Sequence, residues 1–104
     1  MTESYDGLFV GGGHNSLVCA AYLAKAGKKV AVLERSNVAG GGCSTHEVTL
    51  PGFKHNLHSN YYVGLERSPI LSDLELHEYG FSLIFPEFQQ GCAFSDGTAF
   101  VIHR

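Results

Sequence analysis

Two glycine triplets and one acidic residue are the features of this sequence that could bind a ligand. The first triplet opens the run Gly11-Gly12-Gly13-His14-Asn15-Ser16, and Glu34 follows Gly13 by 21 residues. Glycines between a strand and a helix allow a sharp turn and leave backbone amides open to a phosphate at the positive end of the helix. An acid at this distance accepts hydrogen bonds from a ribose diol, and its charge repels a 2′-phosphate. The spacing therefore predicts a dinucleotide site and disfavours NADP.

The motif departs from the usual pattern at one position. Ser16 stands where the third small residue is normally Gly or Ala. Serine is small enough to let the helix approach the strand, so the motif is weakened without being broken. Two plainer interpretations remain open: the glycine turn only joins a strand to a helix, and Glu34 is only a solvent-exposed strand end.

The second glycine triplet, Gly40-Gly41-Gly42, lies in an irregular stretch that begins at Glu34-Arg35. Backbone without side chains indicates a close approach to another group. A nicotinamide-binding domain needs no such stretch after the acid, so this second loop favours FAD over NAD as the dinucleotide.

Three segments must position these residues. Residues 5–10 end in an apolar run stopped by glycine, which predicts a buried strand. Residues 15–26 carry apolar side chains at spacings of three and four and are followed by Gly27, which predicts a helix with a left-handed cap. Residues 29–34 form a second apolar run, typical of a parallel strand covered on both faces. The predicted fold class is α/β, with a Rossmann-like FAD/NAD(P)-binding βαβ unit at its start.

The remaining elements are predicted from turn residues and apolar spacing. Residues 48–53 indicate an extended piece broken by a Pro-Gly turn, and residues 68–79 a capped helix ended by Gly80. Residues 81–85 have the pattern of a strand. Residues 91–95 and 98–102 flank Asp96-Gly97 and predict a hairpin with a two-residue turn.

Composition limits the other classes of function. The 104 residues include 7 Lys and Arg against 10 Asp and Glu, a net charge of −3, which argues against nucleic acid. The three cysteines have no CxxC spacing, the N-terminus is acidic, and no apolar run approaches a membrane span. These features predict a soluble, cytoplasmic protein with reduced thiols. The length permits one small domain with its own core, or part of a larger one.

Residues 5–24, Leu33-Glu34-Arg35 and the pair Gly40-Gly41 together resemble the N-terminal FAD-binding segment of the phytoene desaturase and amine oxidase superfamily. Its phytoene-dehydrogenase-like branch is the most similar, and residues 51–54 and 73–80 also resemble that branch. The resemblance implies a flavoprotein that oxidises or desaturates an apolar or amine-like substrate by hydride transfer to FAD. Residues 1–104 would then be an incomplete N-terminal FAD-binding domain or fragment, inactive alone.

The resemblance also implies which residues surround the cofactor. Gly11, Gly13, Asn15 and Ser16 would face the diphosphate, and Glu34 would hold the adenosine ribose. The full predicted cofactor-binding set is Gly11, Gly12, Gly13, His14, Asn15, Ser16, Glu34, Arg35, Gly40, Gly41 and Gly42. Family members often carry Arg at the positions of Ser36 and Gly42, so two positive contacts are missing here.

The chain shows no pattern for catalysis without a cofactor. His46, His55 and His58, with Cys43 before them, match no zinc spacing, so no metal is expected, and the resemblance makes His55, His58 and Ser59 weak candidates for the flavin face. No catalytic residue is assigned, because in a flavoenzyme the cofactor carries the redox chemistry. Two alternatives stay open: a stand-alone NAD-binding domain, and a non-catalytic module that forms a homodimer through an exposed sheet edge.

Overall fold

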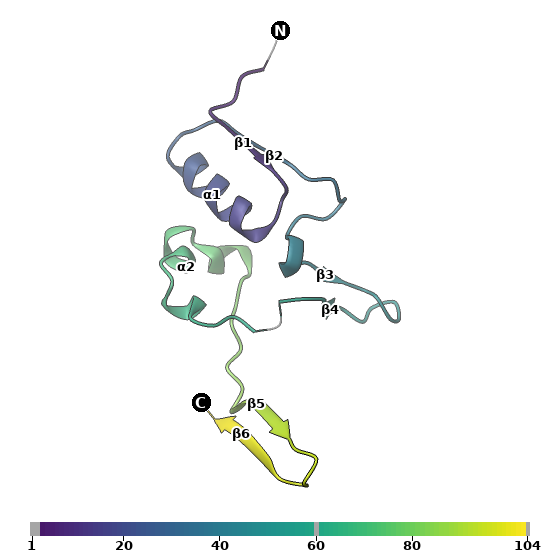
Figure 1. Cartoon of the computed structure of the whole chain (residues 1–104). Coiled ribbons are helices and arrows are strands. Elements are labelled where there is room, and N and C mark those ends of the chain that lie inside the picture. The colour runs from purple at the N-terminus through teal and green to yellow at the C-terminus, as the bar shows by residue number, and fades with distance from the viewer. Residues whose placement is uncertain (1–2, 60, 104) are drawn as a thin grey trace.

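A computed structural model describes residues 3–59 and 61–103, and it opens with the predicted βαβ unit (Figure 1). Strands β1 (Gly7–Val10) and β2 (Val30–Leu33) are parallel, and helix α1 (His14–Lys25) connects them. Gly27, at φ 79°, ends α1 in the left-handed conformation that glycine allows. The predicted strand–helix–strand order is confirmed, with both strands shorter than expected.

The strands of this unit are covered on one face only, which corrects the prediction of two covered faces. The packing partner of β1 and β2 is α1, and Ala20 of α1 is 6% exposed. Leu8, Val10 and Leu33 remain 60%, 84% and 55% exposed. A second layer of helices would have to cover these side chains, as in a doubly wound sheet.

The chain next forms a short hairpin around the Pro-Gly turn. Residues Gly41–Cys43 make one 3-10 turn, and β3 (Thr45–His46) pairs antiparallel with β4 (His55–Asn56). The turn at Pro51-Gly52 is confirmed, since Gly52 has φ 87°. The extended piece predicted at residues 48–53 is wrong in its bounds, because the paired residues flank that segment.

The single helix predicted for residues 68–79 is divided into two. After a 3-10 turn at Leu65–Arg67, helix α2 covers only Ile70–Asp73, and a 3-10 helix follows at Leu76–Tyr79. The break falls at Glu75, at φ 51°. In a continuous helix, the carbonyl oxygen of Asp73 would accept the N–H of His77, but here Lys25 Nζ of α1 donates to it. The hydroxyl of Tyr22 also donates to Asp73 Oδ2 at 2.8 Å, so contacts with α1 hold the end of α2.

The strand predicted at residues 81–85 is not formed. The sheets of the described residues are the pairs β1–β2, β3–β4 and β5–β6, and residues 81–85 belong to none of them. A strand requires a neighbouring strand for its backbone hydrogen bonds, which the apolar pattern alone does not supply. The segment instead lines a cavity beside α2.

The C-terminal hairpin is confirmed, with a longer loop than predicted. Strands β5 (Phe88–Ala93) and β6 (Ala99–His103) are antiparallel. Phe94 N donates to Thr98 O at 2.8 Å, and Gly97 N donates to Phe94 O at 3.1 Å with Gly97 at φ 85°. The loop is therefore three residues long, a tight turn followed by a left-handed glycine, and not the two-residue turn expected at Asp96-Gly97.

A substitution pair tests the role of this left-handed glycine. Gly97→Ala is expected to destabilise the hairpin by about 1–2 kcal/mol, because an L-residue is strained at positive φ. Gly91→Ala is the matched control, since its added Cβ would meet no atom closer than 3.5 Å. NMR contacts between the rings of Phe94 and Phe100, whose centroids are 6.0 Å apart, report the hairpin population. Equal loss of these contacts in both variants would contradict the assignment.

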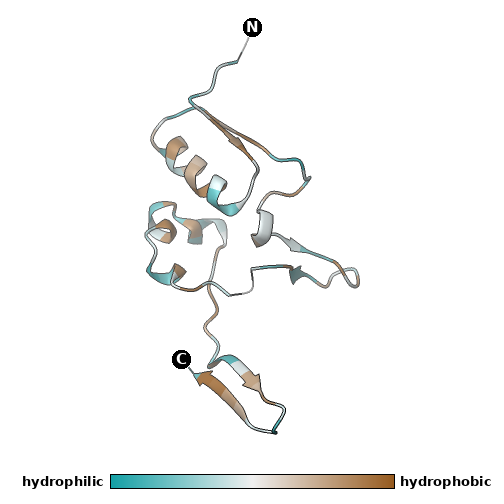
Figure 2. Cartoon of the chain, in the orientation of Figure 1, coloured by the Kyte–Doolittle hydropathy of each residue, from teal (hydrophilic) through white to brown (hydrophobic). Residues whose placement is uncertain are grey.

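The expected hydrophobic core is absent from the described residues. Ala20 is the only buried apolar residue among them. The radius of gyration is 18.3 Å, against about 13 Å for a compact chain of this length. The accessible surface is 8494 Å², against about 5,700 Å² for a compact protein of this mass. The β5–β6 hairpin projects from the rest of the molecule, and apolar residues are exposed on β1, β2 and β6 (Figure 2). No helix in the described ranges is long and apolar enough to cross a membrane.

Candidate dinucleotide site

The first glycine loop leads from β1 directly into the N-terminus of α1. Gly11 has φ 98°, and its N–H donates to Leu33 O at 2.7 Å, so the chain turns away immediately after the last pairing of β1 with β2. Gly13 is the N-cap of α1, and no side chain caps the helix there. The first turn of α1 also carries no acidic side chain. No side-chain cap or acidic side chain therefore competes with an anion for the N–H groups at the start of α1.

The space beside Gly13 distinguishes this glycine from its neighbour. A Cβ added to Gly12 would lie 3.2 Å from Glu34 Cβ and 3.4 Å from Ala39 Cβ, so packing within the protein requires glycine there. A Cβ added to Gly13 would meet nothing within 4 Å, and Gly13 has φ −71°, which any residue adopts. Neither packing nor backbone conformation therefore requires glycine at position 13. The open space that Gly13 leaves next to the N-terminus of α1 is called the Gly13 cradle below.

Glu34 locks the first glycine loop to the end of β2. Its Oε2 accepts the N–H of Gly12 at 2.6 Å, and its Oε1 accepts the N–H of Ser36 at 2.8 Å. Hydrogen bonds from Ser36 and then Gly12 lower the pKa of the Glu34 carboxyl, the charge of Arg35 adds a smaller effect, and partial burial opposes it. The carboxylate is thus held ionised beside the loop, where it can still accept further hydrogen bonds.

Acid is expected to release this lock. The folded pKa of Glu34 lies below its ordinary value of 4.5, so the stabilisation is complete above pH 4.5 and is lost as the pH falls through the lower, folded value. The amide proton signal of Gly12 should therefore move in an NMR titration in this acid range. Glu34→Gln, which cannot ionise, is the control, and an unchanged titration of Gly12 in that variant would refute the lock.

The second glycine loop packs against the first. Gly40 N donates to Gly12 O at 2.7 Å, and Gly40 pairs with Gly13 as an isolated parallel bridge. Gly41 has φ 56°, and a Cβ on it would lie 3.1 Å from Gly13 Cα. The close approach predicted from the second triplet is thus an approach of one loop to the other, and the two loops meet at Gly13.

The structure brings most of the predicted set together. Gly11, Gly12, Gly13, Glu34, Gly40 and Gly41 form the contacts described above. His14 and Asn15 are exposed in the first turn of α1, Ser16 is half-buried after them, and Arg35 is exposed beside Glu34. Gly42 lies one residue past the contact with Gly13, and a Cβ on it would be 3.7 Å from His58 Cβ.

Sequence reasoning missed two contributors. The N–H of Ser36 holds Glu34, and the side chain of Ala39 packs against Gly12. The first has a partial local signal, since Asp and Asn at a turn accept an amide two residues on, and Glu34 makes the equivalent bond with a longer side chain. The second depends on the return of the chain to the first loop, which no local pattern encodes.

The histidines and Cys43 take local roles. Cys43 Sγ lies 3.4 Å from Ser59 Oγ, and His55 Nε2 lies 2.9 Å from Thr49 Oγ1. Within residues 3–59 and 61–103, no three His, Cys, Asp or Glu side chains are grouped so that they could hold a metal ion. The three cysteines are free thiols.

A parallel βαβ unit with a glycine turn before its helix and an acid after its second strand defines a dinucleotide-binding fold. The chain belongs to the NAD(P)-binding Rossmann-like domain family, whose model matches residues 10–75. It is 41% identical, over 94% of its length, to a limonene dehydrogenase subunit of Castellaniella defragrans. It is 46% identical, over 80% of its length, to pyridine nucleotide-disulfide oxidoreductase domain-containing protein 2 of Mus musculus.

A solved structure shares the fold. The crystal structure of the CLA-producing fatty acid isomerase from P. acnes superposes with a TM-score of 0.67 over 97% of this chain, at 20% identity. The chain spans only a small part of each of these proteins. The matched region makes up 18% of the limonene dehydrogenase subunit, 14% of the mouse protein and 23% of the fatty acid isomerase. The chain therefore corresponds to the dinucleotide-binding part of a larger oxidoreductase fold, and the resemblance inferred from the glycine motifs is confirmed at that level. Its cofactor class is a flavin or nicotinamide dinucleotide.

Proposed function

We propose that residues 1–104 are the N-terminal FAD-binding segment of a flavin-dependent oxidoreductase that needs further polypeptide to turn over its substrate. The observation that carries the proposal is the Gly13 cradle. The backbone conformation of Gly13 does not require glycine. A side chain at this position would nevertheless fill the space beside the N-terminus of α1, which no side chain caps. A diphosphate fits this arrangement, because it needs both open N–H groups and close approach to the backbone.

Each part of the cofactor-binding set has a role in this proposal. The first loop and first turn, Gly11 to Ser16, bind the diphosphate through backbone amides. The carboxylate of Glu34, already fixed by Gly12 and Ser36, accepts hydrogen bonds from the adenosine ribose. In this proposal Arg35 and the second loop, Gly40 to Gly42, also face the cofactor. When bound, FAD supplies a hydride acceptor, and the residues described here orient it.

The substrate class and cellular setting extend the proposal to the whole protein. Limonene, in the name of one relative, is an apolar hydrocarbon, and we infer an apolar substrate for this oxidoreductase.

The three unpaired cysteines are consistent with the reduced cytoplasm. Pairing of two copies through an open sheet edge remains a separate prediction, for which light scattering of the purified protein gives the mass.

Titration of the 104-residue protein with FAD tests the proposal. We expect quenching of flavin fluorescence that saturates and that ADP-ribose reverses. The family description names NAD(P), so NAD is the second candidate ligand. Tighter binding of NAD than of FAD would assign a nicotinamide site, and no quenching or competition with either nucleotide at high micromolar concentration would overturn the proposal.

A further inference from the structure

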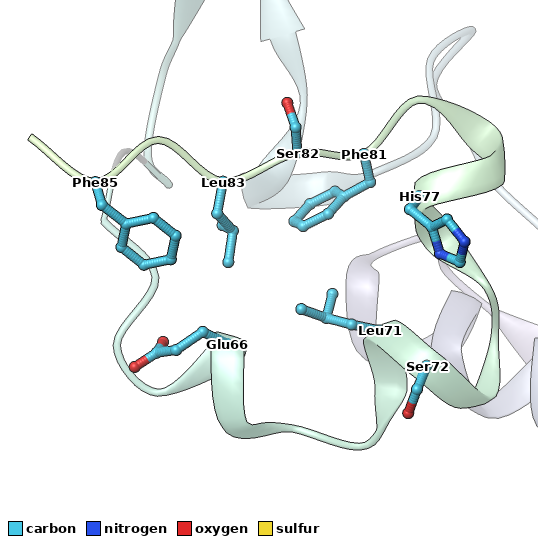
Figure 3. Close-up of a pocket in the computed structure, with 8 residues that line it drawn as sticks. All are labelled: Glu66, Leu71, Ser72, His77, Phe81, Ser82, Leu83 and Phe85. Atoms are coloured by element: carbon cyan, nitrogen blue, oxygen red, sulfur yellow. The ribbon is translucent and has the colours of Figure 1, made fainter.

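A cavity of about 460 Å³ lies between the 3-10 turn at Leu65–Arg67, α2 with the following 3-10 helix, and residues 81–85 (Figure 3). Its size is within the range of about 300–1,000 Å³ that is typical of small-molecule pockets. None of its lining residues belongs to either glycine loop. The cavity is therefore separate from the proposed dinucleotide site.

Apolar side chains point into this cavity from two sides. Leu71 comes from α2, and Phe81, Leu83 and Phe85 follow one another at alternate positions of the extended segment (Figure 3). Alternation along an extended chain places these three side chains on one face, whereas Ile84, 93% exposed, lines a larger adjoining hollow that Phe81, Leu83 and Phe85 also border. The strand-like pattern of residues 81–85 thus serves a cavity and not a sheet.

Most polar side chains at the rim are in contact with other groups or point away from the space. Glu66 Oε1 lies 3.9 Å from Arg67 Nε, and His77 Nε2 lies 3.2 Å from Glu78 Oε1. The hydroxyl of Ser72 donates to Pro69 O at 3.0 Å, and that of Ser82 points away from the space (Figure 3). A ligand would therefore meet mainly hydrocarbon surface in this open cavity, and a charged group would find no dedicated partner in place of the water that it loses there.

We propose that this cavity binds an uncharged, predominantly hydrocarbon molecule. The inference rests on the proposed function, because it gives the apolar substrate class of that oxidoreductase a place on this chain. Burial of the ligand against Leu71, Phe81, Leu83 and Phe85 is the source of affinity, since apolar area removed from water is the main favourable contribution.

The experiment follows leucine and isoleucine methyl signals of the 104-residue protein by NMR. The probes are methylcyclohexene, cyclohexanecarboxylate and cyclohexylmethylamine, which have similar rings and differ in charge. We expect methylcyclohexene to shift the methyl signals of Leu71 and Leu83 in a saturable manner. Leu50, which is 63% exposed and outside the cavity, should not shift. Both charged probes should bind at least about fivefold more weakly.

Leu83→Ser is expected to weaken methylcyclohexene binding by about fivefold or more. Leu50→Ser, at an exposed residue that lines neither the cavity nor the adjoining hollow, should leave it unchanged. Unchanged methyl signals of Leu17 and Leu23 in α1 show that each variant is folded. The proposal is overturned if the wild-type protein gives no saturable shift, if Leu50 shifts in parallel, or if cyclohexylmethylamine binds most tightly. Shifts that depend on protein concentration alone would overturn it in favour of a side chain from a second copy. An FAD titration of the same sample tests the proposed function separately from the cavity proposal. If FAD binds but methylcyclohexene shifts no methyl signal, only the proposal of an apolar ligand in the cavity is refuted.

Discussion

Gly13→Ser should weaken FAD binding about 10- to 150-fold while it stabilises α1. The added side chain occupies the Gly13 cradle, and its hydroxyl can cap an N–H of the first turn that is otherwise available to the diphosphate. Loss of one hydrogen bond to a charged group costs about 1.5–3 kcal/mol, which gives this range of affinities. The new N-cap should add a few tenths of a kcal/mol to helix stability. Fluorescence titration and urea unfolding measure the two effects.

The opposite signs of these two effects distinguish a ligand site from a folding requirement. Gly91→Ser, in β5, is the matched control, because its Cβ would make only ordinary contacts with Phe100 O at 3.5 Å and Val101 Cγ2 at 3.8 Å. It should leave FAD affinity unchanged. If Gly13→Ser retained the affinity of the original protein while its helix became more stable, the diphosphate could not lie in the Gly13 cradle.

The elements that could be predicted from sequence are those whose determinants are local. The apolar runs of β1 and β2, the spacing of α1 and the stop at Gly27 each depend on residues within one turn or strand, and the βαβ unit formed as expected. The predictions from sequence are wrong where contacts between residues distant in the chain determine the structure. Lys25 takes the carbonyl of Asp73 from 48 residues away and helps to end α2, a contact that helical spacing cannot indicate.

The same distinction applies to the candidate site. Glycines at positions 11 and 13 and the acid at position 34 were predictable, because motif spacing reflects the geometry of one βαβ unit. The contacts of Gly12 with Glu34, Ala39 and Gly40 were not, because they depend on the return of the chain after β2. Consequently, the sequence indicated that Glu34 could bind ribose, and only the structure showed that it also locks the loop.

Glu34→Gln is expected to reduce affinity for ADP-ribose about tenfold or more. It should also reduce the ratio by which the protein binds ADP-ribose more tightly than 2′-phospho-ADP-ribose. Both oxygens of Glu34 accept backbone N–H groups, from Gly12 and Ser36. Glutamine has one acceptor oxygen, so one of these amides would face an NH₂ group and lose its bond. The ribose also loses a charged acceptor, whose hydrogen bonds are stronger than those of a neutral amide oxygen. Removal of the negative charge at the same time removes the repulsion of a 2′-phosphate.

Dissociation constants for ADP-ribose and 2′-phospho-ADP-ribose, measured by competition against FAD, separate the two roles of this side chain. Glu87→Gln, an exposed residue just before β5, makes the same change in net charge and should alter neither constant. If Glu34→Gln weakened both nucleotides equally, the carboxylate would only lock the loop, and the ribose assignment would be wrong. A larger loss for ADP-ribose than for its 2′-phosphate requires the carboxylate to face the ribose, because a disordered loop cannot distinguish nucleotides that differ only at that hydroxyl.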